Sequence, residues 1–182
     1  FRYFRSQPIQ SPRTTENLKT QRLTGDGKTS EAAISPDGKF LVYLKVENEQ
    51  SSLWIKQLQA NSAVQVVRPG EISDIYALAF TPDGNFVYFN GEQPDTTAPT
   101  IYRVPTLGGS PAKVLSNATG VTFSSDGKQL AFTRYDIAAV ESSIIVANAA
   151  GTNERVLATL RGKRFFGFRP SWSADGRSLA IP

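Results

Sequence analysis

The chain has 182 residues, of which 40% are hydrophobic and 20% charged, the balance of a globular protein rather than of a disordered or membrane-spanning one. It contains no cysteine, histidine or methionine, which excludes disulfides, thiol nucleophiles, Cys/His zinc sites and histidine-dependent triads and so argues against most enzymes. The net charge of +4 comes entirely from residues 1–22, which hold five basic residues and one acidic residue, so the rest of the chain is balanced.

Residues 1–20 are predicted to form a basic, flexible linker, beginning with Phe-Arg-Tyr-Phe-Arg at positions 1–5. Aromatic residues beside arginine are common where a chain leaves a bilayer, so one hypothesis places a membrane span just before Phe1. The alternative is an ordinary disordered linker. Because the chain has no methionine and begins at Phe1, we expect it to be a processed product or an excised piece.

A five-residue phrase with Asp-Gly at its third and fourth positions recurs four times. Its copies are Ser35-Pro36-Asp37-Gly38-Lys39, Thr81-Pro82-Asp83-Gly84-Asn85, Ser124-Ser125-Asp126-Gly127-Lys128 and Ser173-Ala174-Asp175-Gly176-Arg177. The aspartates are 46, 43 and 49 residues apart, and each phrase lies between two apolar, strand-like runs. We therefore predict a β-hairpin at each copy, in which the glycine takes a positive φ and the aspartate and the leading hydroxyl residue bond turn amides.

Two further apolar strands follow each of the first three hairpins. The third strands are expected at 53–55, 101–104 and 144–146, and the fourth strands at 66–67, 114–115 and 156–157. Four short strands in about 45 residues are the signature of a propeller blade, and no stretch has helical periodicity. The predicted fold is all-β: a partial β-propeller, part of a larger one, with blades at 32–67, 75–115 and 120–157 and an incomplete fourth at 168–182. Residues 21–23 are similar to an outermost strand of the kind that closes a ring.

The Ser-Pro-Asp-Gly-Lys phrase, with the strands 53–55 and 101–104 and the Gly108-Gly109 turn, resembles the TolB-type, WD-repeat-like propeller family over residues 21–182. Such blades occur in periplasmic TolB proteins and in the propellers of prolyl-oligopeptidase-like serine peptidases. They also form extracytoplasmic parts of bacterial Ser/Thr kinases and winged-helix regulators. The resemblance implies an extracytoplasmic or periplasmic location, membrane-anchored in the parent protein, with a cytoplasmic one as the alternative. It does not by itself imply a function.

The turn aspartates Asp37, Asp83, Asp126 and Asp175 are interpreted as structural. Calcium requires six to eight oxygen ligands, usually from several carboxylates of one loop, and each turn offers a single aspartate followed by glycine. Neither a metal nor a cofactor is therefore predicted.

Strand alternation places the Asp-Gly turns on one face of the propeller and the longer, irregular segments on the other. Those segments are 47–51, 68–74, 91–99, 136–142 and 160–168. Because binding residues concentrate in polar loops on a rigid scaffold, we expect function on this second face.

Two of these segments carry the candidate binding residues. The first combines cations with phenylalanines: Arg161, Lys163, Arg164, Phe165, Phe166, Phe168 and Arg169. Such residues can anchor a partner protein, but the favoured interpretation is that the phenylalanines pack between blades while the cations stay solvated. The second offers a weak acidic contact through Glu92 and Asp95. Glu141 beside Ser142 and Ser143 lacks a general base, so a serine hydrolase site is not supported.

The leading functional prediction is a non-catalytic platform that binds a protein, a peptide or a cell-envelope component, as the sensor domain of a membrane-anchored signalling protein. The alternative is the substrate-gating propeller of a prolyl-oligopeptidase-like serine peptidase, which a downstream Gly-x-Ser-x-Gly motif would favour. Nucleic-acid binding is not expected; in that third hypothesis binding is salt-sensitive and weakens when Lys163 and Arg164 are replaced by alanine. Nothing in the sequence indicates a homo-oligomer.

Overall fold

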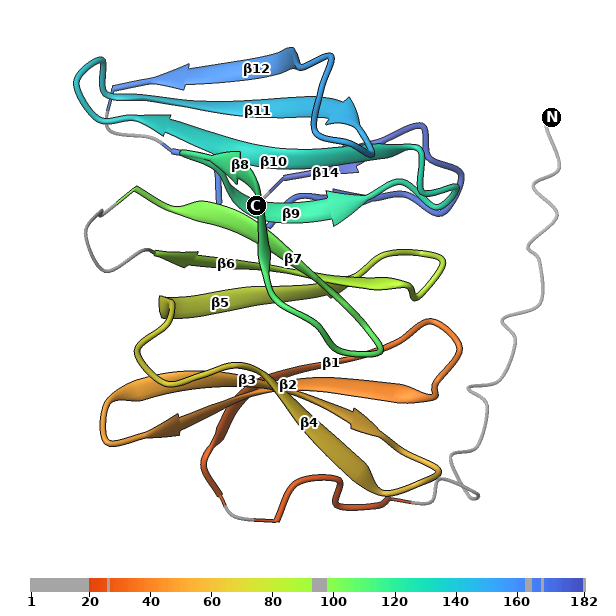
Figure 1. Cartoon of the computed structure of the whole chain (residues 1–182). Coiled ribbons are helices and arrows are strands. Elements are labelled where there is room, and N and C mark those ends of the chain that lie inside the picture. The colour runs from red at the N-terminus through yellow and green to blue at the C-terminus, as the bar shows by residue number, and fades with distance from the viewer. Residues whose placement is uncertain (1–19, 26, 93–97, 163–164, 168, 182) are drawn as a thin grey trace, which may run out of the picture.

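The structure is a computed structural model that describes residues 20–25, 27–92, 98–162, 165–167 and 169–181. Within these ranges the chain contains strands and no helix. Three four-stranded antiparallel sheets lie side by side, face against face, and a two-stranded sheet follows the third (Figure 1). The prediction of an all-β, partial propeller of three blades and part of a fourth is confirmed. The described residues include no helix with the length and hydropathy needed to cross a bilayer.

Each blade is a meander in which strands that follow one another in the sequence are neighbours in the sheet. The first blade contains β1 (Thr29–Ile34), β2 (Phe40–Glu47), β3 (Gln50–Gln57) and β4 (Ser62–Val67). The second contains β5 (Ser73–Phe80), β6 (Phe86–Glu92), β7 (Thr100–Pro105) and β8 (Ala112–Ser116). The third contains β9 (Thr119–Phe123), β10 (Gln129–Asp136), β11 (Glu141–Asn148) and β12 (Arg155–Arg161), and the partial fourth contains β13 (Ser171–Trp172) and β14 (Leu179–Ala180).

Two local predictions are wrong. Residues 21–23 form no strand; they lie beside the first blade, where the Lys56 ammonium donates to the Leu23 carbonyl over 3.0 Å. The segment 47–51 is not a long loop but a tight hairpin between β2 and β3, with Asn48 and Glu49 both at positive φ. This backbone twist suits two-residue hairpins. The predicted linker, apart from Thr20, lies outside the described residues.

The four Asp-Gly turns share one hydrogen-bond pattern. In the first, the Ser35 hydroxyl accepts from the Phe40 amide at 2.9 Å and donates to Asp37 Oδ1 at 2.7 Å, which also accepts from the Lys39 amide at 3.1 Å. Gly38 has a φ of 71°. The contacts recur in the other copies, so the aspartates make the turn contacts that the sequence predicts.

These turns make stability depend on acidity. The hydrogen bond from Ser35, followed by the one from the Lys39 amide, lowers the pKa of Asp37 from 3.8 to about 2. A carboxyl whose pKa is lower in the folded state stabilises the fold above its unfolded pKa, and this contribution disappears as pH falls through the folded pKa. Asp37→Asn is therefore expected to be less stable than the natural chain at pH 7 and to approach it near pH 2.

Thermal unfolding followed by circular dichroism between about pH 2 and pH 7 measures this difference. Asp74→Asn, outside the turns, controls for the loss of one negative charge. A stability difference between the natural chain and Asp37→Asn that stays constant over the whole range would contradict the turn contacts.

The core lies between the blades, and the second blade contributes to it from both faces of its sheet. In β6 the alternating side chains Val87 and Phe89 join the cluster shared with the first blade, while Tyr88 between them joins the cluster shared with the third. Successive strand residues point to opposite faces, so a blade with neighbours on both sides buries consecutive apolar residues. This explains the unbroken apolar run of β6.

Over the residues that the structure describes, adjacent blades share no backbone ladder, and polar side chains connect them instead. The Glu31 carboxylate of β1 accepts from the amides of Ala77 and Leu78 in β5, each over 3.1 Å. Asn90 donates to the Ala118 carbonyl over 2.8 Å and accepts from the Gly120 amide over 2.9 Å. These bonds satisfy backbone groups that no neighbouring strand reaches, and they fix how each blade is placed on the next.

Candidate binding surface on the loop face

The two edges of the stacked sheets carry different connections. The Asp-Gly turns lie along one edge, on the right in Figure 1, and the connections from the second to the third strand of the first and third blades lie along the other. We call the second edge the loop face. The structure therefore separates the short structural turns from the segments in which the sequence predicts binding.

A concave surface with mostly apolar walls lies on the loop face and encloses a volume of about 820 Å³. We call it the loop-face surface, and it is lined by Pro99, Asn117, Tyr135, Asp136, Ile137, Val140, Phe165, Phe166 and Gly167. Three of its large apolar side chains are exposed to solvent: Ile137 is 89% exposed, Phe165 49% and Val140 44%. Grouped exposed apolar side chains mark interaction sites, whereas isolated ones do not.

Hydrogen bonds hold the segment 165–167 against the third blade. The Tyr135 hydroxyl donates to the Phe166 carbonyl over 2.8 Å, and the Phe166 amide donates to the Ser142 hydroxyl over 3.0 Å. The rings of Tyr135 and Phe165 lie 6.0 Å apart. Burial, and secondarily the phenol of Tyr76, raises the pKa of Tyr135, so this side chain remains a neutral donor. The backbone beside the apolar rings is thus anchored.

The turn between β10 and β11 presents the other apolar residues. Asp136 accepts from the Ala139 amide over 2.9 Å, and the Val140 amide donates to the Ile137 carbonyl over 3.3 Å. The Val140 carbonyl accepts from the Gly162 amide over 2.9 Å. Because these bonds occupy the backbone groups of the turn, Ile137 projects from a defined scaffold rather than from a free loop.

The structure divides the predicted cationic–aromatic segment. Phe165 and Phe166 line the loop-face surface. Arg161 forms an ion pair with Glu141 over 2.6 Å, and Arg169 forms one with Glu31 of the first blade, away from the surface. Three further predicted binding residues lie outside the described residues: Lys163, Arg164 and Phe168.

The predicted acidic contact is not part of the loop-face surface as described. Glu92 ends β6, where its carbonyl accepts from the Ser73 hydroxyl over 3.2 Å, and Asp95 lies outside the described residues. The sequence analysis missed Ile137 and Val140. The signal that could have revealed these two residues is the apolar run Ile-Ala-Ala-Val at 137–140, inside a segment that was predicted to be a polar loop.

The chemistry of the loop-face surface is that of apolar contact. Ser142 is fully buried and its hydroxyl accepts from the Phe166 amide, so it is not placed as a nucleophile. Among the described residues no three acidic side chains gather as metal ligands would. The surface can accommodate apolar side chains of a partner, and Asp136 and Asn117 are the polar residues of its lining besides Tyr135.

Comparison with known proteins identifies the fold. No family model matches the sequence. An uncharacterized protein of Agrobacterium fabrum is 24% identical over 155 residues, which cover 80% of this chain and 52% of the relative; the chain thus spans about half of it. Two solved structures match with a TM-score of 0.67: a TolB candidate from Agrobacterium tumefaciens (22% identity, 87% of this chain, 60% of that one) and TolB from Acinetobacter baumannii (20% identity, 86% and 38%).

Propellers of other proteins match as well. An acylaminoacyl peptidase has a TM-score of 0.58 at 16% identity, over 84% of this chain and 27% of that one. A chain of a nidogen–laminin complex has a TM-score of 0.60 at 16% identity, over 82% and 54%. At these identities the comparisons show the fold, which is that of TolB-type β-propellers.

Proposed function

We propose that the chain is a non-catalytic propeller platform whose loop-face surface binds a protein or peptide partner through apolar side chains. The observation that carries the proposal is the exposure of Ile137, Val140 and Phe165 together on one anchored concavity. Burying one such side chain contributes about 1.5–3 kcal/mol, and large apolar anchors in well-packed recesses dominate the free energy of protein association.

The fold supports this function without identifying a partner. Propellers present loops on a rigid stack of sheets, and the solved structures with this fold include a chain of the nidogen–laminin complex. The likeness to TolB proteins favours an extracytoplasmic location. A place as the sensor domain of a larger, membrane-anchored signalling protein is part of the same proposal and rests on the sequence resemblance alone.

The test is a capture experiment with a matched control on the opposite face. Ile137→Asp combined with Val140→Asp places two charges in the loop-face surface and is expected to weaken partner binding at least about tenfold. Leu107→Asp changes an equally open leucine, 85% exposed, beside the Asp-Gly turns, and is expected to leave binding unchanged. Immobilised natural chain and both variants are incubated with cell-envelope extract, and the bound protein is quantified by mass spectrometry.

The proposal requires one protein or a small set that the double variant loses and that the Leu107 variant retains. Equal capture by all three chains would assign binding to another surface. Loss of capture by both variants would attribute it to general hydrophobic adhesion. Circular dichroism of each variant establishes that the sheet structure is intact.

The second candidate is the gating propeller of a serine peptidase, which the match to the acylaminoacyl peptidase favours. The parent gene distinguishes the two. A Gly-x-Ser-x-Gly motif in an α/β-hydrolase domain downstream of residue 182 supports the peptidase, and a kinase or DNA-binding domain upstream of residue 1 supports the sensor.

A further inference from the structure

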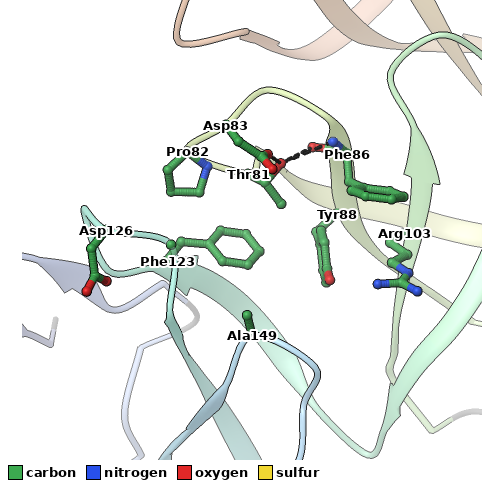
Figure 2. A pocket seen from close by; sticks show the side chains of 10 residues that line it. Thr81, Pro82, Asp83, Phe86, Tyr88, Arg103, Phe123, Asp126 and Ala149 are labelled. Atoms are coloured by element: carbon green, nitrogen blue, oxygen red, sulfur yellow. Dashed lines mark hydrogen bonds between the residues drawn. The ribbon is translucent and has the colours of Figure 1, made fainter.

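A second concavity lies on the opposite face, in the groove between the second and third blades. It has a volume of about 270 Å³, at the lower end of the range for small-molecule sites. Its lining, drawn in Figure 2, comprises Thr81, Pro82, Asp83, Phe86, Tyr88, Arg103, Phe123, Asp126, Gly127 and Ala149. It shares no residue with the loop-face surface and has a different chemical character.

Three aromatic rings and one cation form its walls. Tyr88 and Phe123 meet edge to face with their centroids 4.9 Å apart, and the Arg103 guanidinium lies 5.0 Å from the centroid of the Phe86 ring. Figure 2 shows Arg103 on one side of the groove and Asp126 on the other, with the Tyr88 and Phe123 rings between them. The groove is thus apolar in its middle and charged at its two ends, and the carboxylate of Asp83, which Thr81 and Asn85 hold by hydrogen bonds, also lines it.

The repeat itself shows that Arg103 is exceptional. Tyr88, five residues after its turn aspartate, is paired with Arg103 in the register of β6 and β7. The equivalent pairs are Val42 with Ile55 in the first blade and Ala131 with Val146 in the third. Ile55 and Val146 are both buried aliphatic residues, whereas Arg103 is exposed. The blade architecture therefore does not require a cation at this position.

The Arg103 guanidinium also has N–H donors that its contact with Phe86 leaves unused. Within the described part of the chain it forms no ion pair, and its one recorded contact is with the face of Phe86. A guanidinium presents five N–H donors in a planar fork that matches a carboxylate, and a ring face occupies none of them. The N–H donors of Arg103 are therefore available to an anion that enters the groove.

The opposite end of the groove is anionic. Asp126 uses Oδ1 for the Ser124 hydroxyl and the Lys128 amide, while Oδ2 has the Lys128 ammonium 3.7 Å away. The hydrogen bond from Ser124 lowers the pKa of Asp126, so the group is a carboxylate at neutral pH. Oδ2 retains the capacity to accept from an incoming ammonium.

We propose that the groove between the second and third blades binds a short peptide with free termini and an apolar side chain. Its carboxylate pairs with Arg103, its ammonium pairs with Asp126, and its side chain lies against the rings of Tyr88 and Phe123. Each terminus has one charged partner in the groove, so a ligand with both termini free is expected to bind more tightly than one that lacks either. The volume of the groove restricts the ligand to about a dipeptide.

The experiment uses the dipeptide Gly-Phe as probe, titrated into the 15N-labelled chain while NMR follows the Arg103 Nε–H and the amides of Gly127 and Ala149. Gly-Phe is expected to shift these signals saturably. N-acetyl-Gly-Phe lacks the ammonium and Gly-Phe-amide lacks the carboxylate, and each is expected to bind at least about tenfold more weakly, since a hydrogen bond between charged groups is lost.

The matched variants separate the site from the fold. Arg103→Ile installs the residue that the first blade carries at this position, so the sheet should tolerate it while Gly-Phe binding falls at least about tenfold. Arg155→Ile removes an exposed arginine of β12 and should leave binding unchanged. Absence of a saturable shift, tight binding of either blocked dipeptide, or unchanged binding to Arg103→Ile would each overturn the proposal. Capture of a partner by the loop-face surface is expected to persist in Arg103→Ile, so the two proposals fail separately.

Discussion

Replacing Phe132 by alanine is expected to lower the free energy of unfolding by about 3–5 kcal/mol. Its side chain is fully buried in the cluster that the second and third blades share, beside Leu130 and Ile145, and the Arg134 guanidinium lies 5.2 Å from the ring centroid. Removing the ring leaves a cavity between two sheets whose backbones cannot move together freely. Urea unfolding followed by circular dichroism measures the loss.

Phe165→Ala is the matched control, because it makes the same chemical change at a half-exposed side chain in the segment that is held against the third blade. Its expected cost is below about 1 kcal/mol. If the two variants lost similar stability, or if Phe132→Ala stayed within about 1 kcal/mol of the natural chain, the third blade would not pack on the second as described.

Replacing Asn90 by leucine is expected to cost about 2–4 kcal/mol although the side chain has nearly the same size. Asn90 is fully buried, and its amide group pairs the carbonyl of Ala118 and the amide of Gly120 at the inner edge of β9. Leucine leaves both backbone groups buried without a partner, and each unpaired group costs about 1–3 kcal/mol. The loss is measured by urea unfolding.

Hydrogen exchange gives this prediction a local readout. The Gly120 amide should exchange faster in Asn90→Leu than in the natural chain, more than the global loss of stability accounts for. Asn85→Leu, in an exposed turn, is the control and should change neither quantity appreciably. Slow exchange of Gly120 in Asn90→Leu would show that the blades are connected differently at this point.

The blade architecture was predictable because its signals are local. The leading hydroxyl, the aspartate and the glycine of each turn bond one another within five residues, so their spacing alone indicates a hairpin. The blade boundaries were less predictable. Between Thr29 and Glu31 the pairing of β1 with β2 shifts register, and such a bulge interrupts the apolar alternation from which a strand is recognised.

The position of the candidate site could be predicted from the sequence better than the residues that form it. Alternation of strand direction located the loop face, and Phe165 and Phe166 lie on it, but Arg169 does not contribute to it because it pairs with Glu31, 138 residues away. No local pattern signals such a distant contact. The repeat register does hint at it, since Arg169 precedes its turn aspartate by six residues, as Glu31 does.

Arg103 illustrates a signal that was available and not used. Aligning the third strands of the three blades on their first apolar residues, Leu53, Ile101 and Ile144, puts it in line with two aliphatic residues, Ile55 and Val146. A departure from a repeat is informative because the neighbouring copies show what the fold alone requires. The same alignment could not have shown that the arginine borders a groove, which depends on how the second and third blades pack.

The central claim is that this propeller works as a binding platform whose partner meets the loop face. Photo-crosslinking tests it most directly, with benzoylphenylalanine placed in turn at 137, 140 and 165 on the loop face and at 107 beside the Asp-Gly turns. The account predicts that one partner crosslinks at the three loop-face positions and not at 107. Crosslinks confined to 107, or equally strong at all four positions, would contradict it.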